Sequence, residues 1–456
     1  MPSVIELYAI VWYSANGTYL LIKGKYREGN FIMIIKNGNL IDPASGIFSK
    51  KDILIENGII SKVSDNINPN EYSEADLIDA SDLTVCPGFT DVHVHFRDPG
   101  FPDKETMHTG ALAAAAGGYT SVVCMANTSP AIDNVDLYKE ISEKASAEDI
   151  HIYQAASITK TRSGNECVDM KALKDAGVVL FTDDGSPIMK EDVIKEAMKK
   201  AASLNTILSF HEEDPAYIGT SGVNAGPAAE ALGLKGADRE AEIAMVRRDI
   251  EIAFETGAMI DIQHISAAES VSLLREAKKN DPHNLLHAEA TPNHFSLTEE
   301  AVAKYGTLAK INPPLRTEAD RLAIIEGLKD GTIDMIATDH APHTSEEKAR
   351  PFHKAPSGII GLETAFSLAL KNLVLNGHLS MPELIRLMSL NPAKLLGLNA
   401  GKLSEGSPAD IAIVSVSKDS CYSSFRSRSS NSPFLGETLP GSVEMTICSG
   451  KTVFKK

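Results

Sequence analysis

The sequence is poor in cysteine, and its cysteines follow no pairing pattern. Five occur among 456 residues, at positions 86, 124, 167, 421 and 448, with no C-x-x-C spacing. Such an odd and irregular set does not build a disulfide framework. Most of these residues lie in apolar runs, which predicts buried thiols in a reducing cytoplasm.

Long hydrophobic runs, a targeting segment and a basic surface are missing as well. No stretch reaches the roughly 18 apolar residues that a membrane helix requires, and the apolar segment 4–11 lacks the flanks of a signal peptide. The formal net charge of -17 argues against a nucleic-acid surface. We therefore expect a cytoplasmic protein whose partner is a small molecule, with any anionic substrate held by metal ions and a few arginines.

The two ends of the chain have the same character. Residues 33–86 and 400–456 consist of short alternating strands, with hairpin signals at Asn37-Gly38, Asn57-Gly58 and Ser449-Gly450. Neither end closes a core by itself. We predict that the two pair into one small β-sandwich domain.

The first residues do not fit this pattern. Met33 opens the first plausible strand, whereas residues 1–32 match nothing that follows. We therefore predict that residues 1–32 are a poorly ordered leader and that translation starts at Met33.

Residues 87–399 repeat a strand followed by a helix. The strands are nearly continuous apolar runs, which is typical of a parallel sheet covered by helices. Eight such units in one run predict an α/β fold of the (β/α)8 TIM-barrel type. The strand candidates are residues 90–96, 120–125, 151–156, 178–182, 206–210, 258–264, 284–290 and 334–338.

Polar residues gather where these strands end. His93 and His95 lie two apart on a strand, so they point to the same face. A bare H-x-H also occurs on ordinary polar strand faces. The ends of the later strands favour a metal site, because the catalytic residues of such a barrel lie at its C-terminal face. The residues at these ends are His93, His95, Arg97, Asn127, Ser157, Asp183, Asp184, His211, His264, Thr291, His294, Asp339, His340 and His343.

Several of these residues form a predicted metal site. Imidazole and carboxylate without thiolate suit a catalytic pair of zinc ions, which deprotonate a water near neutral pH and polarise a carbonyl. The predicted reaction is metal-assisted attack on an amide or imide, or its reverse. The ligand candidates are His93, His95, His211, His264, Asp339 and a carboxylate from Asp183 or Asp184.

Two residues have candidate roles beyond ligation. Asp339 can take a proton from the attacking water and hand it to the leaving nitrogen, although a loop N-cap is the simpler role for an aspartate. Arg97 lies one alternation beyond His95 and can grip a carboxylate bidentately. A surface ion pair is its structural alternative.

The ordered set of motifs resembles the amidohydrolase superfamily, and within it the bacterial class I dihydroorotases. The resemblance runs from about Met33 to the C-terminus. Each motif is modest alone, and together they are highly specific. The matching segments are residues 91–100, 125–128, 181–185, 211–213, 264–266, 311–316, 338–343 and 355–364.

This resemblance implies a role for each matching residue. His93 and His95 would bind one zinc and His211 and His264 the other, with Asp184 bridging them. Asp339 would be the acid/base that also touches a metal. The implied reaction is the reversible cyclisation of N-carbamoyl-L-aspartate to L-dihydroorotate in pyrimidine biosynthesis. Implied contacts to the substrate carboxylate are Arg97, Asn127 and His343, and those to its ring are Asn312, Ser357 and Gly358.

Rival functions remain. Hydantoinases, dihydropyrimidinases and allantoinases share the barrel but bridge their metals with a carboxylated lysine on the fourth strand, and here no lysine follows Val178 until Lys190. A non-catalytic paralogue would have lost ligands, and none is missing. Ala126 and Asn293 depart from the family pattern on the substrate side. The resemblance also implies a homo-oligomer, and leaves open an aspartate transcarbamoylase partner and a lid function for residues 344–356.

Overall fold

The computed structural model describes residues 5–13, 18–26, 31–72 and 74–456. Strands β1 (Ile5–Tyr13) and β2 (Thr18–Tyr26) form an antiparallel hairpin. The prediction of a poorly ordered leader therefore falls partly on this hairpin and partly outside the described residues. A translation start at Met33 stays a prediction.

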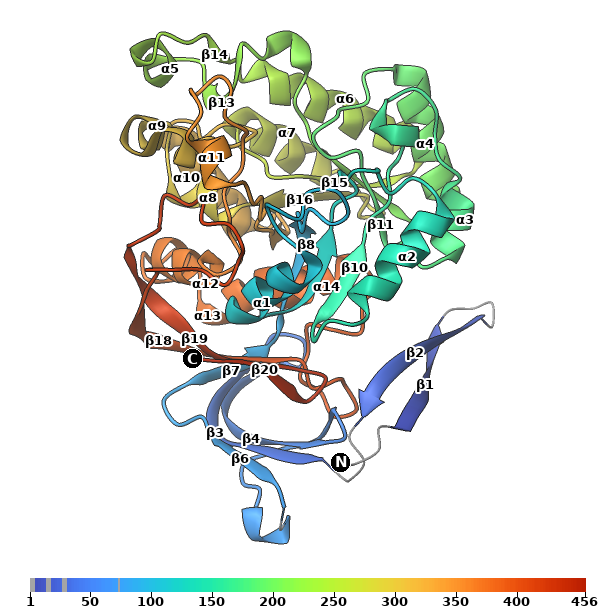
Figure 1. Cartoon of the computed structure of the whole chain (residues 1–456), viewed down its shortest axis with the longest axis vertical. Helices are drawn as coiled ribbons and strands as arrows, with labels where there is room; N and C mark the ends of the chain where they lie inside the picture. Colours follow the sequence, from blue (N-terminus) through green and yellow to red (C-terminus); the bar gives the residue numbers. More distant parts are fainter. Residues whose placement is uncertain (1–4, 14–17, 27–30, 73) are drawn as a thin grey trace.

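The middle of the chain forms a closed barrel with helices around it (Figure 1). Parallel pairing runs in the orders β10-β9-β8 and β11-β12-β15-β16-β17. Two parallel bridges, Ala156 to Phe181 and Val94 to His340, join these sheets into a ring. The barrel fold is thus confirmed, with every predicted strand present. The strands are β8 (Phe89–Val94), β9 (Tyr119–Cys124), β10 (His151–Gln154), β11 (Leu180–Phe181), β12 (Ile207–Phe210), β15 (Met259–Ile262), β16 (Leu286–Ala290) and β17 (Met335–Ile336).

The predicted helices are also present. The helix after the eighth strand, α12 (Ala365–Ala369), continues directly as a π-helix over Leu370–Val374. The helices that follow the barrel strands are α1 (Met107–Ala116), α2 (Val135–Ala145), α3 (Met170–Asp175), α4 (Glu191–Leu204), α6 (Glu240–Thr256), α7 (Ala268–Lys278), α10 (Glu318–Asp330) and α12 (Ala365–Ala369).

Smaller elements interrupt this regular order. Strands β13 (Thr220–Asn224) and β14 (Gly236–Ala237) pair with each other between β12 and α6, and α5 (Pro227–Ala231) lies between them. The sequence did not predict this insertion. The remaining helices are α8 (Pro292–Ser296), α9 (Glu300–Tyr305), α11 (Ser345–Lys348), α13 (Met381–Ile385) and α14 (Asn391–Leu395).

The two chain ends share one strongly curved sheet below the barrel (Figure 1). Its order is β20-β19-β18-β7-β3-β4-β5, with β6 beside β3, so β7 joins C-terminal to N-terminal strands. Ile35, Ile55, Ile411 and Ile447 belong to the buried apolar cluster of this sheet. The predicted β-sandwich is confirmed, while its division at residues 33–86 and 400–456 stays a proposal. The strands are β3 (Ile32–Asp42), β4 (Ile47–Glu56), β5 (Ile59–Ser64), β6 (Asp76–Asp79), β7 (Thr84–Pro87), β18 (Ile411–Cys421), β19 (Thr438–Cys448) and β20 (Lys451–Lys455).

Two of the three hairpin signals are confirmed. Asn57-Gly58 joins β4 to β5 and Ser449-Gly450 joins β19 to β20, each with both residues at positive φ. The prediction for Asn37-Gly38 is wrong. Asn37 has a φ of 63° but lies within β3, where the pairing with β4 shifts register. Some bulges place a residue in the same left-handed backbone region as a hairpin turn, so the dipeptide alone does not distinguish the two.

All five cysteines are free, and four of them are buried, as the sequence predicts; Cys421 is exposed. Among the residues that the structure describes, no helix is both long and apolar enough to cross a membrane.

Candidate metal centre and substrate pocket

Two histidines and two aspartates meet where β8 and β17 end. His95 Nε2 lies 2.9 Å from Asp339 Oδ1 and 3.6 Å from Asp184 Oδ2. His93 Nε2 lies 3.6 Å from Asp339 Oδ1 and 3.7 Å from Asp184 Oδ1. Both rings therefore turn the same nitrogen toward both carboxylates.

A second pair of histidines lies on the other side of Asp184. His211 Nδ1 is 3.5 Å from Asp184 Oδ1 and 3.0 Å from His264 Nε2. Asp183 points elsewhere, because its carboxylate accepts hydrogen bonds from the backbone of Ile158 and Thr159. Of the two aspartates that the sequence offered, Asp184 is the one between the histidine pairs.

The backbone is unusual at two of these positions. His264 has a φ of 33° and Asp339 a φ of 47°, a region that residues other than glycine rarely occupy. Such conformations persist only where the surrounding structure enforces them, and they cluster at functional sites. Each of these residues follows a barrel strand, so the turn directs its side chain toward the other candidate ligands.

Outer hydrogen-bond partners fix the orientation of three rings. Glu289 Oε2 lies 3.0 Å from His93 Nδ1 and Asn127 Oδ1 lies 2.9 Å from His95 Nδ1. Glu213 Oε2 lies 2.9 Å from His211 Nε2. If these nitrogens carry the ring protons, the opposite ring nitrogens are unprotonated and turn their lone pairs toward the centre, where they can bind a metal. The list of candidate residues from sequence omitted both glutamates, although a charged Glu289 within a buried strand requires a partner.

The centre has a strongly negative character. Burial alone would lower the pKa of His93, but the carboxylates of Glu289, Asp184 and Asp339 raise that pKa to about 10. Burial also favours neutral His211, but its hydrogen bonds to the carboxylates of Asp184 and Glu213 outweigh this effect, so the pKa of His211 rises to about 10. Surroundings that hold cations this firmly also favour divalent metal ions.

The residues fit a metal centre. His93 Nε2 is buried and has no hydrogen-bond partner among the described residues, a costly arrangement unless a ligand compensates it. Ligand atoms of His93, His95 and Asp339 lie within 4.8 Å of one another, as do those of His93, Asp184 and His264. Six nitrogen and oxygen donors without a thiolate are suitable for a pair of divalent ions.

Cationic side chains gather in the neighbouring predicted substrate pocket, where one of them, Lys104, also pairs with Glu347 at 2.9 Å. Arg97 Nη2 lies 3.4 Å from His343 Nε2, and that nitrogen donates a hydrogen bond of 2.8 Å to the Ser357 carbonyl. His343 Nδ1 can then accept from Lys104 Nζ at 3.4 Å. Burial, with Arg97, Lys104 and Lys348 nearby, lowers the pKa of His343. A neutral histidine beside an arginine and a lysine leaves room for an anion.

The predicted ring contacts also come together. Asn312 Nδ2 donates to Ser221 Oγ at 2.7 Å, and Ser221 Oγ lies 3.5 Å from Ser357 Oγ. Ser221 lies on β13, in the insertion that the sequence did not reveal. Gly358 has a φ of 142°, and a Cβ atom there would lie 2.9 Å from His343 Cδ2, so glycine permits the close approach. Asn127 instead contacts the metal side, where its Nδ2 donates to Asp184 Oδ2 at 2.7 Å.

The segment between β18 and β19 reaches this pocket. Asn431 accepts a hydrogen bond from the His343 backbone at 3.0 Å and donates to the carbonyls of Ala341 and Gly358, each at 3.0 Å. The loop over residues 344–356 is tied down as well, because Lys348 Nζ donates to the Pro356 and Gly358 carbonyls. The C-terminal segment thus organises the pocket as well as the sandwich.

Other histidines from the strand ends have structural partners. His294 Nε2 lies 3.0 Å from the Pro313 carbonyl, and His340 Nδ1 accepts from the Gly361 backbone at 3.2 Å. Neither belongs to the groups of potential ligands in the barrel. A position at the end of a barrel strand is therefore not sufficient to make a histidine a candidate metal ligand.

Comparisons with known proteins agree with this geometry. The model of the amidohydrolase family matches residues 84–453. Dihydroorotase of Clostridioides difficile (strain 630) is 53% identical over 423 residues, which cover 93% of this chain and 100% of that protein. The chain belongs to the amidohydrolase family, in its dihydroorotase branch.

Further relatives support membership of this branch. Dihydroorotase of Clostridium acetobutylicum is 50% identical over 428 residues, covering 93% of this chain and 100% of that protein. Among solved structures, L-hydantoinase (dihydropyrimidinase) from Arthrobacter aurescens superposes with a TM-score of 0.83 at 25% identity, covering 93% of this chain and 96% of that one. The amidohydrolase barrel and sandwich are therefore common to both activities, and the residues of the site must distinguish them.

Proposed function

We propose that this amidohydrolase is a dihydroorotase, which interconverts N-carbamoyl-L-aspartate and L-dihydroorotate by closing and opening a cyclic amide. Full-length similarity to dihydroorotases supports the assignment. The observation that carries it is the position of Asp184 between the two histidine pairs, where the rival hydantoinases would need a lysine.

The proposed cofactor is zinc, two ions per chain. His93 and His95 would hold one ion and His211 and His264 the other, with Asp184 shared between them. When bound, the ions would supply Lewis-acid polarisation of the amide carbonyl and a lower pKa for water. The chain's own contribution is to hold the imidazoles by their outer partners and to keep the ligand nitrogens turned inward.

Asp339 is the proposed acid/base. Its side chain is 14% exposed, whereas that of His93 is fully buried, so Asp339 can contact both a metal ion and the substrate. In ring opening, its carboxylate takes the proton of the attacking water and delivers it to the amide nitrogen as the carbon–nitrogen bond breaks. In ring closure, the same proton moves in the opposite direction.

Arg97 and His343 are proposed to bind the substrate carboxylate, and Asn312, Ser357 and Gly358 its ring. Support comes from the cationic surroundings, in which Arg97 and Lys104 both approach His343. Asn127 is proposed to position that carboxylate too, from its place beside His95. A free carboxylate would distinguish dihydroorotate from neutral hydantoins.

Arg97→Met is expected to weaken substrate binding more than turnover. Loss of a charge-assisted hydrogen bond, which contributes about 1.5–3 kcal/mol, should raise KM by about 10–100-fold while kcat changes less. Steady-state kinetics with dihydroorotate measure both. Arg97→Lys keeps the positive charge but loses the two-pronged guanidinium group, so its KM should lie between those of the wild type and Arg97→Met. A loss confined to kcat would contradict the assignment.

Glu289→Gln is expected to weaken zinc binding without removing a ligand. Outer partners of a ligating histidine typically contribute about 10–100-fold in metal affinity, so competition with a chelating dye should show a drop of this size. Glu276→Gln on the exposed face of α7, where Glu276 pairs with Lys279, is the matched control. Equal affinities in both variants would mean that Glu289 does not orient His93.

Substrate choice tests the function itself. The purified full-length chain should open the dihydroorotate ring, followed as a loss of ultraviolet absorbance, and should leave hydantoin and allantoin unchanged. Activity on hydantoin or allantoin but not on dihydroorotate would assign it to a rival branch. A metal-loaded protein inert toward all three would favour the non-catalytic paralogue.

We further propose a cytoplasmic homo-oligomer, acting alone or beside an aspartate transcarbamoylase. The set of free cysteines supports a reducing compartment. Light scattering after size exclusion, with and without the transcarbamoylase, would measure the assembly, and a monomer unaffected by that partner would contradict it.

A further inference from the structure

A separate group of potential metal ligands lies where the barrel meets the sandwich. His151 is the first residue of β10, Asp410 precedes β18, and Cys448 ends β19. One ligand atom from each lies within 4.8 Å of the other two. Because His151 opens its strand, the group is at the opposite end of the barrel from the proposed zinc pair.

The contacts within this group are specific. His151 Nε2 lies 3.1 Å from Asp410 Oδ2. The other carboxylate oxygen of Asp410 accepts a hydrogen bond of 2.7 Å from the Ser449 backbone, which fixes the carboxylate. Cys448 Sγ is 3.7 Å from the Thr120 carbonyl, a weak contact for a thiol. An ion pair would explain why His151 and Asp410 lie close together, but it would not explain why the Cys448 thiol lies beside them.

The donors and their exposure suit zinc. Thiolate, imidazole and carboxylate are all zinc ligands, and four of them in a tetrahedron lie about 3.3–3.8 Å apart. Here the His151 and Asp410 atoms are 3.1 Å apart, and all three ligand atoms lie within 4.8 Å of one another. Asp410 and Cys448 are buried, while the side chain of His151 is 36% exposed. A cation can therefore enter beside His151, and a water can complete the tetrahedron.

We propose that His151, Asp410 and Cys448 bind a further zinc ion, distinct from the proposed catalytic pair. Binding would form a bond from zinc to Cys448 Sγ and release the thiol proton to solvent, without any redox change. The three ligands come from a barrel strand and from two positions in the sandwich sheet. The ion would thus tie the sandwich to the barrel, and this role does not depend on the identity of the substrate.

Cobalt substitution distinguishes this site from the catalytic one. Only a thiolate ligand gives a near-ultraviolet sulfur-to-cobalt charge-transfer band, and the proposed catalytic ligands include no cysteine. The full-length chain reconstituted with Co²⁺ should show that band at one equivalent per chain. Absence of the band at saturating Co²⁺ would overturn the proposal.

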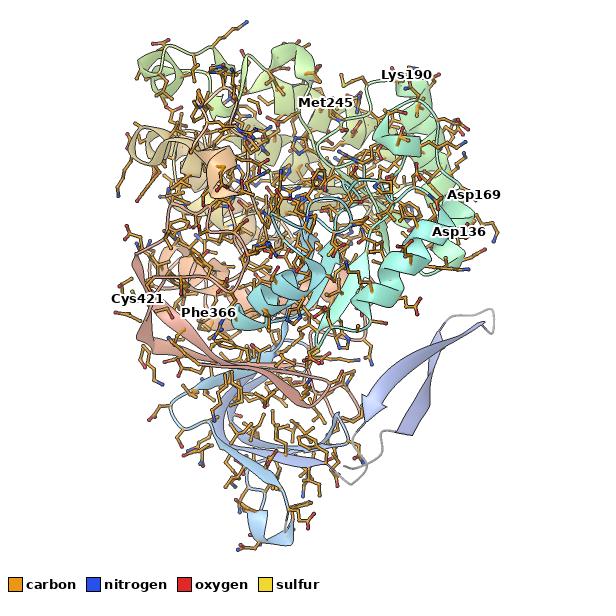
Figure 2. All side chains as sticks on the ribbon, viewed as in Figure 1. Asp136, Asp169, Lys190, Met245, Phe366 and Cys421 are labelled. Carbon is orange, nitrogen blue, oxygen red and sulfur yellow. The ribbon has the colours of Figure 1, made fainter. Side chains whose placement is uncertain are left out.

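Matched variants identify the ligands. Cys448→Ser should lose the band and bind one equivalent of metal fewer. Cys421→Ser should keep both, because Cys421 lies at the exposed end of β18 (Figure 2). Since Cys448 is buried, His151→Gln provides a second variant that leaves the thiol in place, and it should weaken or shift the band. Circular dichroism verifies folding. A band that survives in Cys448→Ser, or disappears in Cys421→Ser, would contradict the assignment.

Discussion

Asp339→Asn is expected to lower turnover of dihydroorotate by about 10²–10⁴-fold, the range that a positioned acid/base contributes. The amide keeps the shape of the side chain and one oxygen near His95, but it cannot accept the proton. Metal content should stay close to that of the wild type, because four histidines and Asp184 remain. Single-turnover kinetics and metal analysis on the same sample test both statements.

The control lies at the other end of the same strand. Asp334 precedes β17 and pairs with Lys278 at 2.6 Å, away from the proposed ligands. Asp334→Asn should retain turnover while losing an ion pair. If Asp339→Asn instead kept its turnover but lost metal, Asp339 would be a ligand without a proton-transfer role.

Much of the fold was predictable because each barrel unit carries its own signal. A buried parallel strand is nearly continuous in apolar residues, and the helix after it has its own period. The β13–β14 insertion has neither signal, since it is short and rich in glycine. The prediction of a hairpin turn at Asn37-Gly38 was wrong for a related reason. The local sequence indicates a positive φ, but it does not determine whether the chain reverses direction there.

The site was predictable to the extent that its residues follow strands. His93, His95, His211, His264 and Asp339 could be found because parallel strands end at the same face. Glu289 lies 196 residues from His93 in the sequence, so its hydrogen bond depends on the closed barrel. His340 also lies at a strand end, but it was not a ligand candidate, and its ring serves a structural contact with the Gly361 backbone.

The charges of the candidate site divide it into two sides. Asp184, Asp339 and Glu289 surround the histidines and favour cations. Arg97 and Lys104 approach His343 and favour an anion. The motif that begins at His93 joins the two sides, because Arg97 follows His95 by two residues. A substrate with a carboxylate at one end and an amide at the other would match this division.

Asp184→Asn and Asp183→Asn provide the sharpest test of the metal centre, since the two residues are adjacent and face opposite ways. Asp184 lies between both histidine pairs, so its replacement should lower metal affinity by more than about 100-fold, beyond the cost of losing an outer partner. Turnover should fall with metal occupancy and recover in part at high zinc concentration.

Asp183→Asn should behave differently. Its carboxylate accepts hydrogen bonds from the backbone of Ile158 and Thr159, so the variant should lose about 1–3 kcal/mol of unfolding free energy and retain its metal. Denaturant unfolding and metal analysis of both variants separate the two effects. If Asp183→Asn lost the metal while Asp184→Asn kept it, the bridging role would belong to Asp183. The proposed distinction from hydantoinases, which rests on the position of Asp184, would then lose its structural basis.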